Sequence, residues 1–198
     1  TQYLSCTDAA CGGTSKLDIG TGNWSTGAWV KTSKVPQQFI VSKGTSSGQY
    51  SYDLKLINGG SPVFTLNNTG DTAYIVASAS ARFNDGVWHY VVGTYDGTTA
   101  SVYTDGVLQN SSTSKSGSQV TDSTSDFQIG ARTDATANYF SGTIDEPFVT
   151  ATALTPGQIK NMYKVGYRDL QSHGTTLGGV AADANQQLGS IFVKLRGF

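Results

Sequence analysis

Three Asp-Gly pairs lie at nearly even spacing within residues 84–108, which read NDGVWHYVVGTYDGTTASVYTDGVL. Glycine adopts positive φ without steric cost and aspartate tolerates it, so Asp-Gly between apolar runs is a strong signal for a tight hairpin turn. The pairs therefore predict a β-meander, with strands at 87–95, at 100–104 and from 107 onward. Both faces of the first strand carry apolar side chains, which is typical of a middle strand in a two-sheet sandwich.

Short runs of apolar and β-branched residues recur along most of the chain, separated by clusters of Gly, Ser, Asn and Asp. Such runs predict strands. Besides the meander, the expected strands lie at residues 2–5, 24–31, 38–43, 50–57, 62–66, 73–78, 126–131 and 140–151. The pattern is that of an all-β fold, and 198 residues suit one main sandwich domain.

One short helix is signalled near the C-terminus. Thr155 is a good N-cap, Gln158 completes a Thr-x-x-Gln capping box, and Gly166 is expected to end the helix. The remaining residues, 167–198, are interpreted as a linker and a strand at 190–195. This strand has no obvious partner, so we expect it to contact a following domain or another subunit, with a missing edge of the sandwich as the alternative.

Several motifs stand in a characteristic order: AWVK at 28–31, WHYV at 88–91, GTYDG at 93–97, YTDG at 103–106, FQIG at 127–130 and FSGTIDE at 140–146. This order resembles the laminin G-like, concanavalin A-like lectin/glucanase family. The resemblance covers about residues 1–165 and implies a two-sheet antiparallel jelly-roll sandwich over residues 1–166. The lead-in to the family's first strand is missing before Thr1, so the chain looks like a piece of a larger protein. The fold hosts many activities, so function has to be argued from a site.

Charge and composition narrow the choice of partners. Charged residues make up 14% of the chain, the net charge is -1, and the 13 Lys and Arg residues are scattered. Because a nucleic-acid surface needs clustered cations, we expect no nucleic-acid partner. No apolar run reaches the length of about 18 residues that spans a bilayer, so we also expect no membrane insertion.

Cys6 and Cys11 are the only cysteines. Two ligands are too few for a zinc site, which needs about four. A local disulfide between them is one interpretation, provided that their Cα atoms come within about 7 Å, and it would suit an extracellular setting. Two free thiols are the other.

The sequence lacks the residue patterns that catalysis usually needs. The glucanases of this fold use Glu-x-Asp-x-Glu on one strand, whereas this chain has a single glutamate, Glu146. Asp145 and Glu146 are adjacent, so on a regular strand their side chains would point to opposite faces. Of the two histidines, His89 is expected to be a structural residue of its strand and His173 lies in the presumed linker. We therefore expect no enzyme activity.

Calcium is the one cofactor that the resemblance suggests, because members of this superfamily often bind it through loop oxygens. By resemblance, Asp145 of the IDE motif is the candidate ligand. The alternative is that Asp145 braces a turn. Asp85, Asp96 and Asp105 are expected to be turn residues and not metal ligands.

Glycan binding needs aromatic faces and nearby polar groups. Two segments offer both: the loop that contains Arg132, Asp134, Asn138 and Tyr139, and the early strand that contains Tyr50 and Tyr52. The alternative is an ordinary solvated loop and ordinary strand tyrosines. The three tryptophans, Trp24, Trp29 and Trp88, are expected in the core.

Together these features favour a non-catalytic recognition domain that binds glycan or protein through sandwich loops, located outside the cell, on a cell surface or on a virion. The first alternative is a structural or assembly module of a larger surface object such as an adhesin, a filament or a virus particle. The second is a polysaccharide hydrolase.

Overall fold

The computed structural model describes residues 3–7, 17–19, 22–45, 49–57, 59–67, 73–119, 125–132, 138–172 and 191–192. These ranges contain one helix and twelve strands. The strands are β1 (Leu4–Cys6), β2 (Trp24–Lys31), β3 (Gln38–Thr45), β4 (Gln49–Ile57), β5 (Ser61–Asn67), β6 (Ala73–Ser78), β7 (Trp88–Tyr95), β8 (Ala100–Thr104), β9 (Val107–Ser112), β10 (Phe127–Ile129), β11 (Thr143–Thr150) and β12 (Ile191–Phe192). The helix is α1 (Pro156–Ser172).

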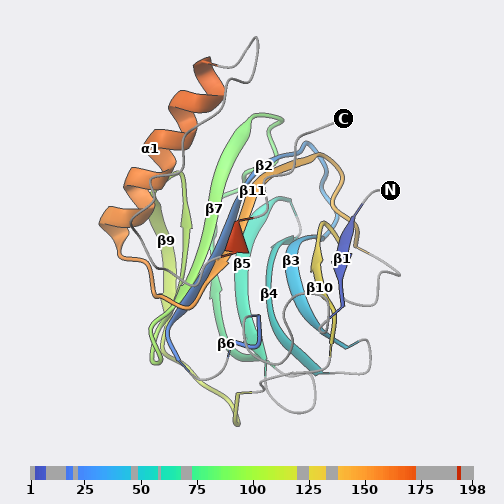
Figure 1. Ribbon diagram of the computed structural model, residues 1–198, viewed down its shortest axis with the longest axis vertical. Helices are drawn as coiled ribbons and strands as arrows, with labels where there is room; N and C mark the ends of the chain where they lie inside the picture. Colours follow the sequence, from blue (N-terminus) through green and yellow to red (C-terminus); the bar gives the residue numbers. More distant parts are fainter. Residues whose placement is uncertain are drawn as a thin grey trace.

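The described strands form two antiparallel sheets that pack face to face (Figure 1). The first sheet has the order β1-β10-β3-β4-β5-β6, and the second has the order β12-β11-β2-β7-β8-β9. Neighbours in each sheet often come from distant parts of the sequence, as when β2 lies between β11 and β7. The prediction of an all-β jelly-roll sandwich with one C-terminal helix is confirmed.

The meander β7-β8-β9 forms three neighbouring strands of the second sheet. Asp96 Oδ1 accepts hydrogen bonds from the backbone N–H groups of Thr98 and Thr99, at 2.9 and 2.7 Å. Asp105 itself has a φ of 55°, the left-handed conformation that Asp tolerates in a turn. The aspartates of the meander therefore act as turn residues, as predicted.

The core between the sheets is built around Trp24, which is fully buried and lies 4.6 Å from the ring of Tyr52 and 5.0 Å from that of Phe64. Gly93 of β7 faces the ring of Phe64. A Cβ at Gly93 would lie 2.2 Å from Phe64, so the close packing of the sheets requires glycine.

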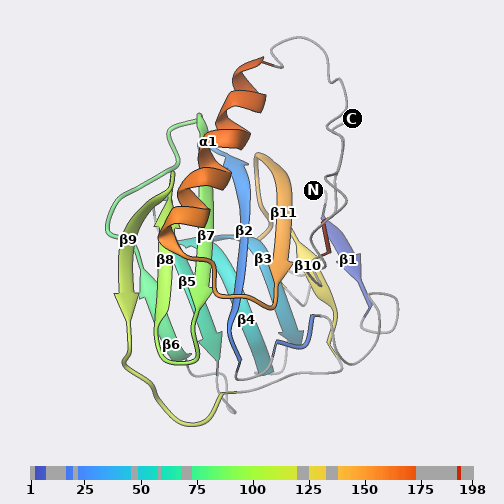
Figure 2. The ribbon, with the colours of Figure 1, turned by 60° about the vertical axis from the view of Figure 1, so that its left-hand side comes forward.

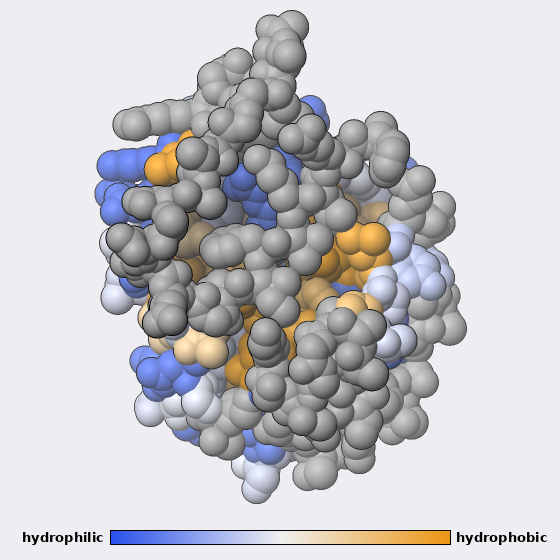
Figure 3. All heavy atoms as spheres, viewed as in Figure 1, coloured by the Kyte–Doolittle hydropathy of each residue, from blue (hydrophilic) through white to orange (hydrophobic). Residues whose placement is uncertain are grey.

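On the side of the molecule shown in Figure 3, hydrophobic residues are visible in the middle of the face, and hydrophilic residues lie along its left and lower margins.

Helix α1 lies across the outer face of the second sheet (Figure 2). Its Ile159 is fully buried, and its Tyr163 stacks on Trp29 of β2 with ring centres 5.5 Å apart. The predicted capping box is present: Thr155 N donates to Gln158 Oε1 at 2.8 Å, and Gln158 N donates to Thr155 Oγ1 at 3.3 Å. No described helix is long and apolar enough to cross a membrane.

The expected end of the helix at Gly166 is wrong, because α1 continues across that position to Ser172. Gly166 serves packing instead of termination. A Cβ at this position would lie 2.4 Å from Nε1 of Trp29, so only glycine lets the helix come this close to β2. Residues 167–172, which were interpreted as linker, therefore belong to the helix.

The C-terminal strand pairs within the chain's own sandwich, and a contact with a following domain or another subunit stays a prediction. β12 pairs antiparallel with β11 and forms an edge of the second sheet, with Phe192 opposite Phe148 and Ile191 opposite Val149. The alternative, a missing edge of the chain's own sandwich, is what the structure shows. No local sequence signal distinguishes the two, because strand pairing depends on residues far apart in the chain.

Candidate functional site

The outward face of the first sheet carries a cavity of about 420 Å³. Its lining consists of outward-pointing side chains, because side chains alternate along each strand. In β4, Leu54 and Leu56 point into the core, whereas Asp53, Lys55 and Ile57 point outward. The described residues that line the cavity are Gln37, Phe39, Asp53, Lys55, Ile57, Val63, Thr65, Asn67, Val76, Ser78 and Arg132. Four neighbouring strands, β3 to β6, thus form its floor.

An ion pair lies in the floor of this cavity. Lys55 Nζ is 3.0 Å from Oδ1 and 3.1 Å from Oδ2 of Asp53, and it lies 5.3 Å from the centre of the Phe39 ring. The side chain of Asp53 is 4% exposed and that of Lys55 is 17% exposed. Burial of a charge is costly unless a partner compensates it, so this pair is held in a fixed place.

A row of polar residues continues from the cavity across the sheet. Gln128 lies opposite Ser42, Ser42 opposite Asp53, and Asp53 opposite Thr65. All four are between 0% and 4% exposed. Ser42 Oγ donates to the carbonyl oxygen of Ala131 at 2.9 Å. The outward face of the first sheet is therefore polar but not freely solvated, a combination typical of a surface with fixed donors and acceptors.

Part of the predicted ligand loop lies at this cavity. Arg132 lines the cavity and is half-buried. Asn138 and Tyr139 follow at the end of the same loop, where the carbonyl oxygen of Asn138 accepts a hydrogen bond from Phe39 N at 3.1 Å. The ring of Tyr139 lies 5.8 Å from that of Tyr3. The loop thus joins the strand that supplies the floor of the cavity. Asp134 lies outside the described residues.

The prediction for Tyr52 is wrong. This residue is 1% exposed and points into the core, where its hydroxyl donates to the carbonyl oxygen of Leu17 at 3.1 Å. Burial raises the pKa of Tyr52, and the nearby carboxylate of Asp18 raises it further. The residue of this strand segment that lines the cavity is Asp53. The sequence does carry the signal, because Tyr52 is in phase with Leu54 and Leu56. The side chain of Tyr50 lies outside those described.

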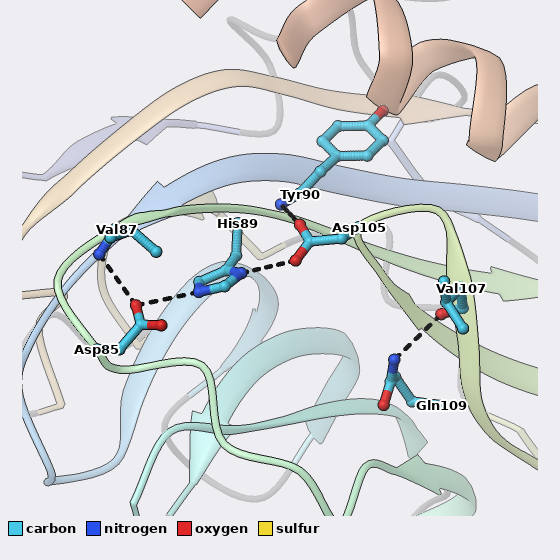
Figure 4. A network of polar contacts seen from close by, with 7 residues as sticks. All are labelled: Asp85, Val87, His89, Tyr90, Asp105, Val107 and Gln109. Carbon is cyan, nitrogen blue, oxygen red and sulfur yellow. Dashed lines mark hydrogen bonds and ion pairs between the residues drawn. The ribbon is translucent and has the colours of Figure 1, made fainter.

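His89 lies between two carboxylates at one end of the second sheet (Figure 4). Its Nδ1 is 2.7 Å from Asp105 Oδ2, and its Nε2 is 3.1 Å from Asp85 Oδ1. Asp85 Oδ1 also accepts a hydrogen bond from Val87 N at 3.0 Å, and Asp105 Oδ1 accepts one from Tyr90 N at 2.9 Å. We call His89 with these two aspartates the His89 clamp. Because both ring nitrogens contact carboxylates, the clamp is a structural link between two turns, as expected for His89.

Burial alone would lower the pKa of His89, but the hydrogen bond and charge of Asp105, together with those of Asp85, outweigh burial and raise it. The pKa of Asp85 is lowered, chiefly by the hydrogen bond from Val87 N and further by His89. Both ring nitrogens face carboxylate oxygens, so both can donate a hydrogen bond only when the imidazole is protonated, and the raised pKa favours this form.

Asp145 lies at an irregularity of β11. The register with β2 shifts between Asp145 and Phe148, and Glu146 has a φ of 48°. Asp145 Oδ1 accepts a hydrogen bond from Glu146 N at 2.9 Å. The expectation that these two side chains alternate as on a regular strand is therefore wrong, because a bulge breaks the alternation. This hydrogen bond agrees with the alternative that Asp145 braces a turn, and it does not decide whether Asp145 also binds calcium.

These residues do not by themselves make a calcium site. Calcium takes about six to eight oxygen ligands. Across the ranges that the structure describes, no group of three or more His, Cys, Asp or Glu side chains is arranged so that it could hold a metal ion. Calcium binding at Asp145 therefore stays a proposal. Cys6 is disulfide-bonded, and Cys11, the other cysteine of the chain, lies outside the described residues.

Comparison with known proteins gives a family and a set of folds. A family model described as the concanavalin A-like lectin/glucanases superfamily matches residues 5–160. No curated protein matches the sequence. The CBM40 module of the Ruminococcus gnavus IT-sialidase, bound to α2,3 sialyllactose, is 16% identical, with a TM-score of 0.64 over 74% of this chain and 85% of that chain.

Two further solved structures are similar. The native heptameric SAP-like pentraxin from Limulus polyphemus is 16% identical, with a TM-score of 0.56 over 87% of this chain and 82% of that chain. The binding domain of botulinum neurotoxin DC, in complex with rat synaptotagmin II, is 12% identical, with a TM-score of 0.60 over 82% of this chain. The chain spans only 40% of that domain's length. At such identities the likeness shows the fold alone.

Proposed function

Because the chain belongs to the concanavalin A-like lectin/glucanase superfamily, we propose that it is a non-catalytic recognition domain that binds a glycan in the cavity on the outward face of the first sheet. The observation that supports this proposal is the cavity, whose lining combines apolar side chains with polar groups at fixed positions. Its volume of about 420 Å³ lies within the range of ligand pockets, roughly 300–1,000 Å³. Sugar hydroxyls need donors and acceptors at fixed positions, and Asp53, Lys55, Thr65 and Asn67 supply them.

The absence of catalysis is part of the proposal. A retaining glycosidase needs two carboxyl groups about 5 Å apart. The described lining of the cavity contains one carboxylate, Asp53, and Lys55 lies against both of its oxygens. A carboxylate held in this way is a poor nucleophile and a poor general acid, so binding without turnover is what the lining supports.

A protein ligand is less well supported. Among the similar folds, one holds a sialylated sugar and another is in complex with a protein. In this chain the polar, charged lining of the cavity favours a sugar. The alternative of an assembly module loses one of the two observations that motivated it, the unpaired C-terminal strand, because β12 pairs within its own sandwich.

We further propose that the domain works outside the cell or on a cell or virion surface, which its disulfide-bonded Cys6 supports, because disulfides persist in oxidising compartments.

The experiment is a glycan array with two matched variants. Val76→Trp places an indole at the half-buried outward position of β6 that lines the cavity, whereas Val107→Trp adds the same group at a 61% exposed position of β9. The proposal predicts that the wild type and Val107→Trp bind the same glycans and that Val76→Trp loses them. It is overturned if the wild type binds no glycan with or without calcium, or if both variants bind alike.

A further inference from the structure

Three aliphatic residues of the cavity lie on a diagonal across neighbouring strands. Val63 of β5 lies opposite Lys55 of β4 on one side and opposite Ser78 of β6 on the other. Ile57 comes two residues after Lys55, and Val76 comes two residues before Ser78. Both are therefore diagonal neighbours of Val63 on the same face of the sheet, at about 7–8 Å. All three side chains line the cavity, and we call Ile57, Val63 and Val76 the aliphatic stripe.

Polar side chains lie directly beside the aliphatic stripe. Thr65 of β5 is opposite Val76 on one side and opposite Asp53 on the other. Asn67, farther along β5, also lines the cavity. Residues directly opposite each other in antiparallel strands have Cβ atoms about 4.5–5.5 Å apart. A ligand the size of one sugar ring therefore meets aliphatic groups at one edge and polar groups at another.

The described lining offers no open aromatic platform. Phe39 supplies its one aromatic ring, which is 4% exposed. The ammonium of Lys55 lies 5.3 Å from the centre of that ring. Stacking of a sugar face needs an exposed ring. In the described lining, the apolar part of a ligand therefore contacts the aliphatic stripe.

We infer that the cavity is selective for a sugar that carries a methyl group and that the aliphatic stripe is the surface that takes this methyl. The inference rests on the proposed function and names the ligand class of the same site. A hydroxyl group placed against aliphatic side chains loses its hydrogen bonds to water without replacement. A methyl group in its place avoids this cost and buries apolar area. The other hydroxyls of the sugar remain within reach of polar side chains such as Thr65 and Asn67.

The methyl group can come from a 6-deoxy sugar or from an N-acetyl sugar, so the test has two arms. Isothermal titration calorimetry compares L-fucose with L-galactose, and N-acetyl-D-glucosamine with N-glycolyl-D-glucosamine. Within each pair, the sugars differ only in a methyl group that becomes a hydroxymethyl group. We expect the methyl member of at least one pair to bind about tenfold more tightly, because an apolar pocket distinguishes such groups by at least that factor. On the glycan array, the glycans that bind should carry such a sugar.

Matched variants locate the surface that takes the methyl. Val76→Thr replaces one methyl of the aliphatic stripe with a hydroxyl at a half-buried position, and Ile57→Thr does so at a second half-buried position. Each is expected to weaken binding of the methyl member more than binding of the hydroxymethyl member. Val107→Thr makes the same change at a 61% exposed position of β9 and is expected to leave the preference unchanged. Thermal unfolding of each variant checks that it is folded.

The outcomes separate this inference from the proposed function. A preference below about threefold in both pairs, less than the burial of one methyl group gives, would overturn the inference, as would the absence of measurable binding in both pairs. Equal losses for both members in Val76→Thr and Ile57→Thr would also overturn it. In each of these cases glycan binding in the cavity stands if the array is positive and Val76→Trp abolishes the signal. If the array is empty as well, both proposals fail.

Discussion

Replacement of His89 tests whether the clamp is an ion pair. Its side chain is 12% exposed, and its contact with Asp105, which is 27% exposed, is the short one at 2.7 Å. A hydrogen bond to a charged group contributes about 1.5–3 kcal/mol. The contact with Asp85, which is 59% exposed, is screened by water and adds at most about 1 kcal/mol. His89→Gln should therefore lower the free energy of unfolding by about 2–3 kcal/mol in mildly acidic solution.

The loss should depend on pH in a defined direction. The pKa of His89 in the folded protein lies above its ordinary value of 6.5. A raised pKa means that the clamp's stabilisation is complete below about pH 6.5 and is lost as the pH rises through the folded-state pKa. The pKa of Asp85 is lowered, so its share is present above about pH 4 and is lost as the pH falls through its folded-state pKa. The effect of His89→Gln should thus be largest between about pH 5 and 6.5.

The assay is urea unfolding of the wild type and His89→Gln at pH 5.5 and pH 9, followed by tryptophan fluorescence. The difference between the two proteins isolates the contribution of His89. Asp105→Asn is the matched control: Asn also tolerates the φ of 55° at this turn, so the variant keeps the backbone and removes the charge. In the Asp105→Asn background, His89→Gln should show a much smaller dependence on pH. A difference that is equal at both pH values, or larger at pH 9, would refute the ion-pair account.

Two further predictions concern the helix and the bulge. Gly166→Ala should destabilise the protein by about 1–3 kcal/mol despite the better helix propensity of Ala, because its Cβ would meet the indole of Trp29. The control is Gly157→Ala, whose Cβ would have nothing within 4 Å and which should be neutral or stabilising. Equal unfolding midpoints for both variants would show that the close approach of α1 to β2 does not constrain the helix. If Asp145 binds calcium, about 1 mM calcium should raise the midpoint of thermal unfolding, and Asp145→Asn should remove that rise. If the wild type unfolds at the same temperature with calcium and with a chelator, the calcium proposal is wrong.

The sequence predicts the architecture well because turns and strands carry local signals. The meander strands were expected at 87–95 and 100–104, and β7 and β8 cover Trp88–Tyr95 and Ala100–Thr104. The failures occur where the outcome depends on distant residues. Gly166 has the local appearance of a helix end, and only its contact with Trp29 shows why it is glycine. β12 finds its partner more than 40 residues away, in β11.

The candidate site was only partly predictable. Arg132 was expected from its loop, and the structure places it at the cavity. Asp53 and Lys55 were not predicted as ligand residues, because the prediction rested on aromatic residues and loops, whereas the cavity is formed by the outward positions of adjacent strands. Their alternation with Leu54 and Leu56 marks the outward face of β4. What the sequence alone does not show is that β3 to β6 bring such positions together into one cavity.

The central claim is that the ligand binds on the outward face of the first sheet. The most direct test is an amide chemical-shift titration by NMR, in which the glycan that binds best on the array is added to the labelled protein. We predict that the shifts concentrate at the cavity residues of β3 to β6 and at Arg132, and that the amides of α1 and of the meander turns do not move. Shifts confined to α1 or to those turns would contradict the claim, as would an unchanged spectrum at saturating sugar.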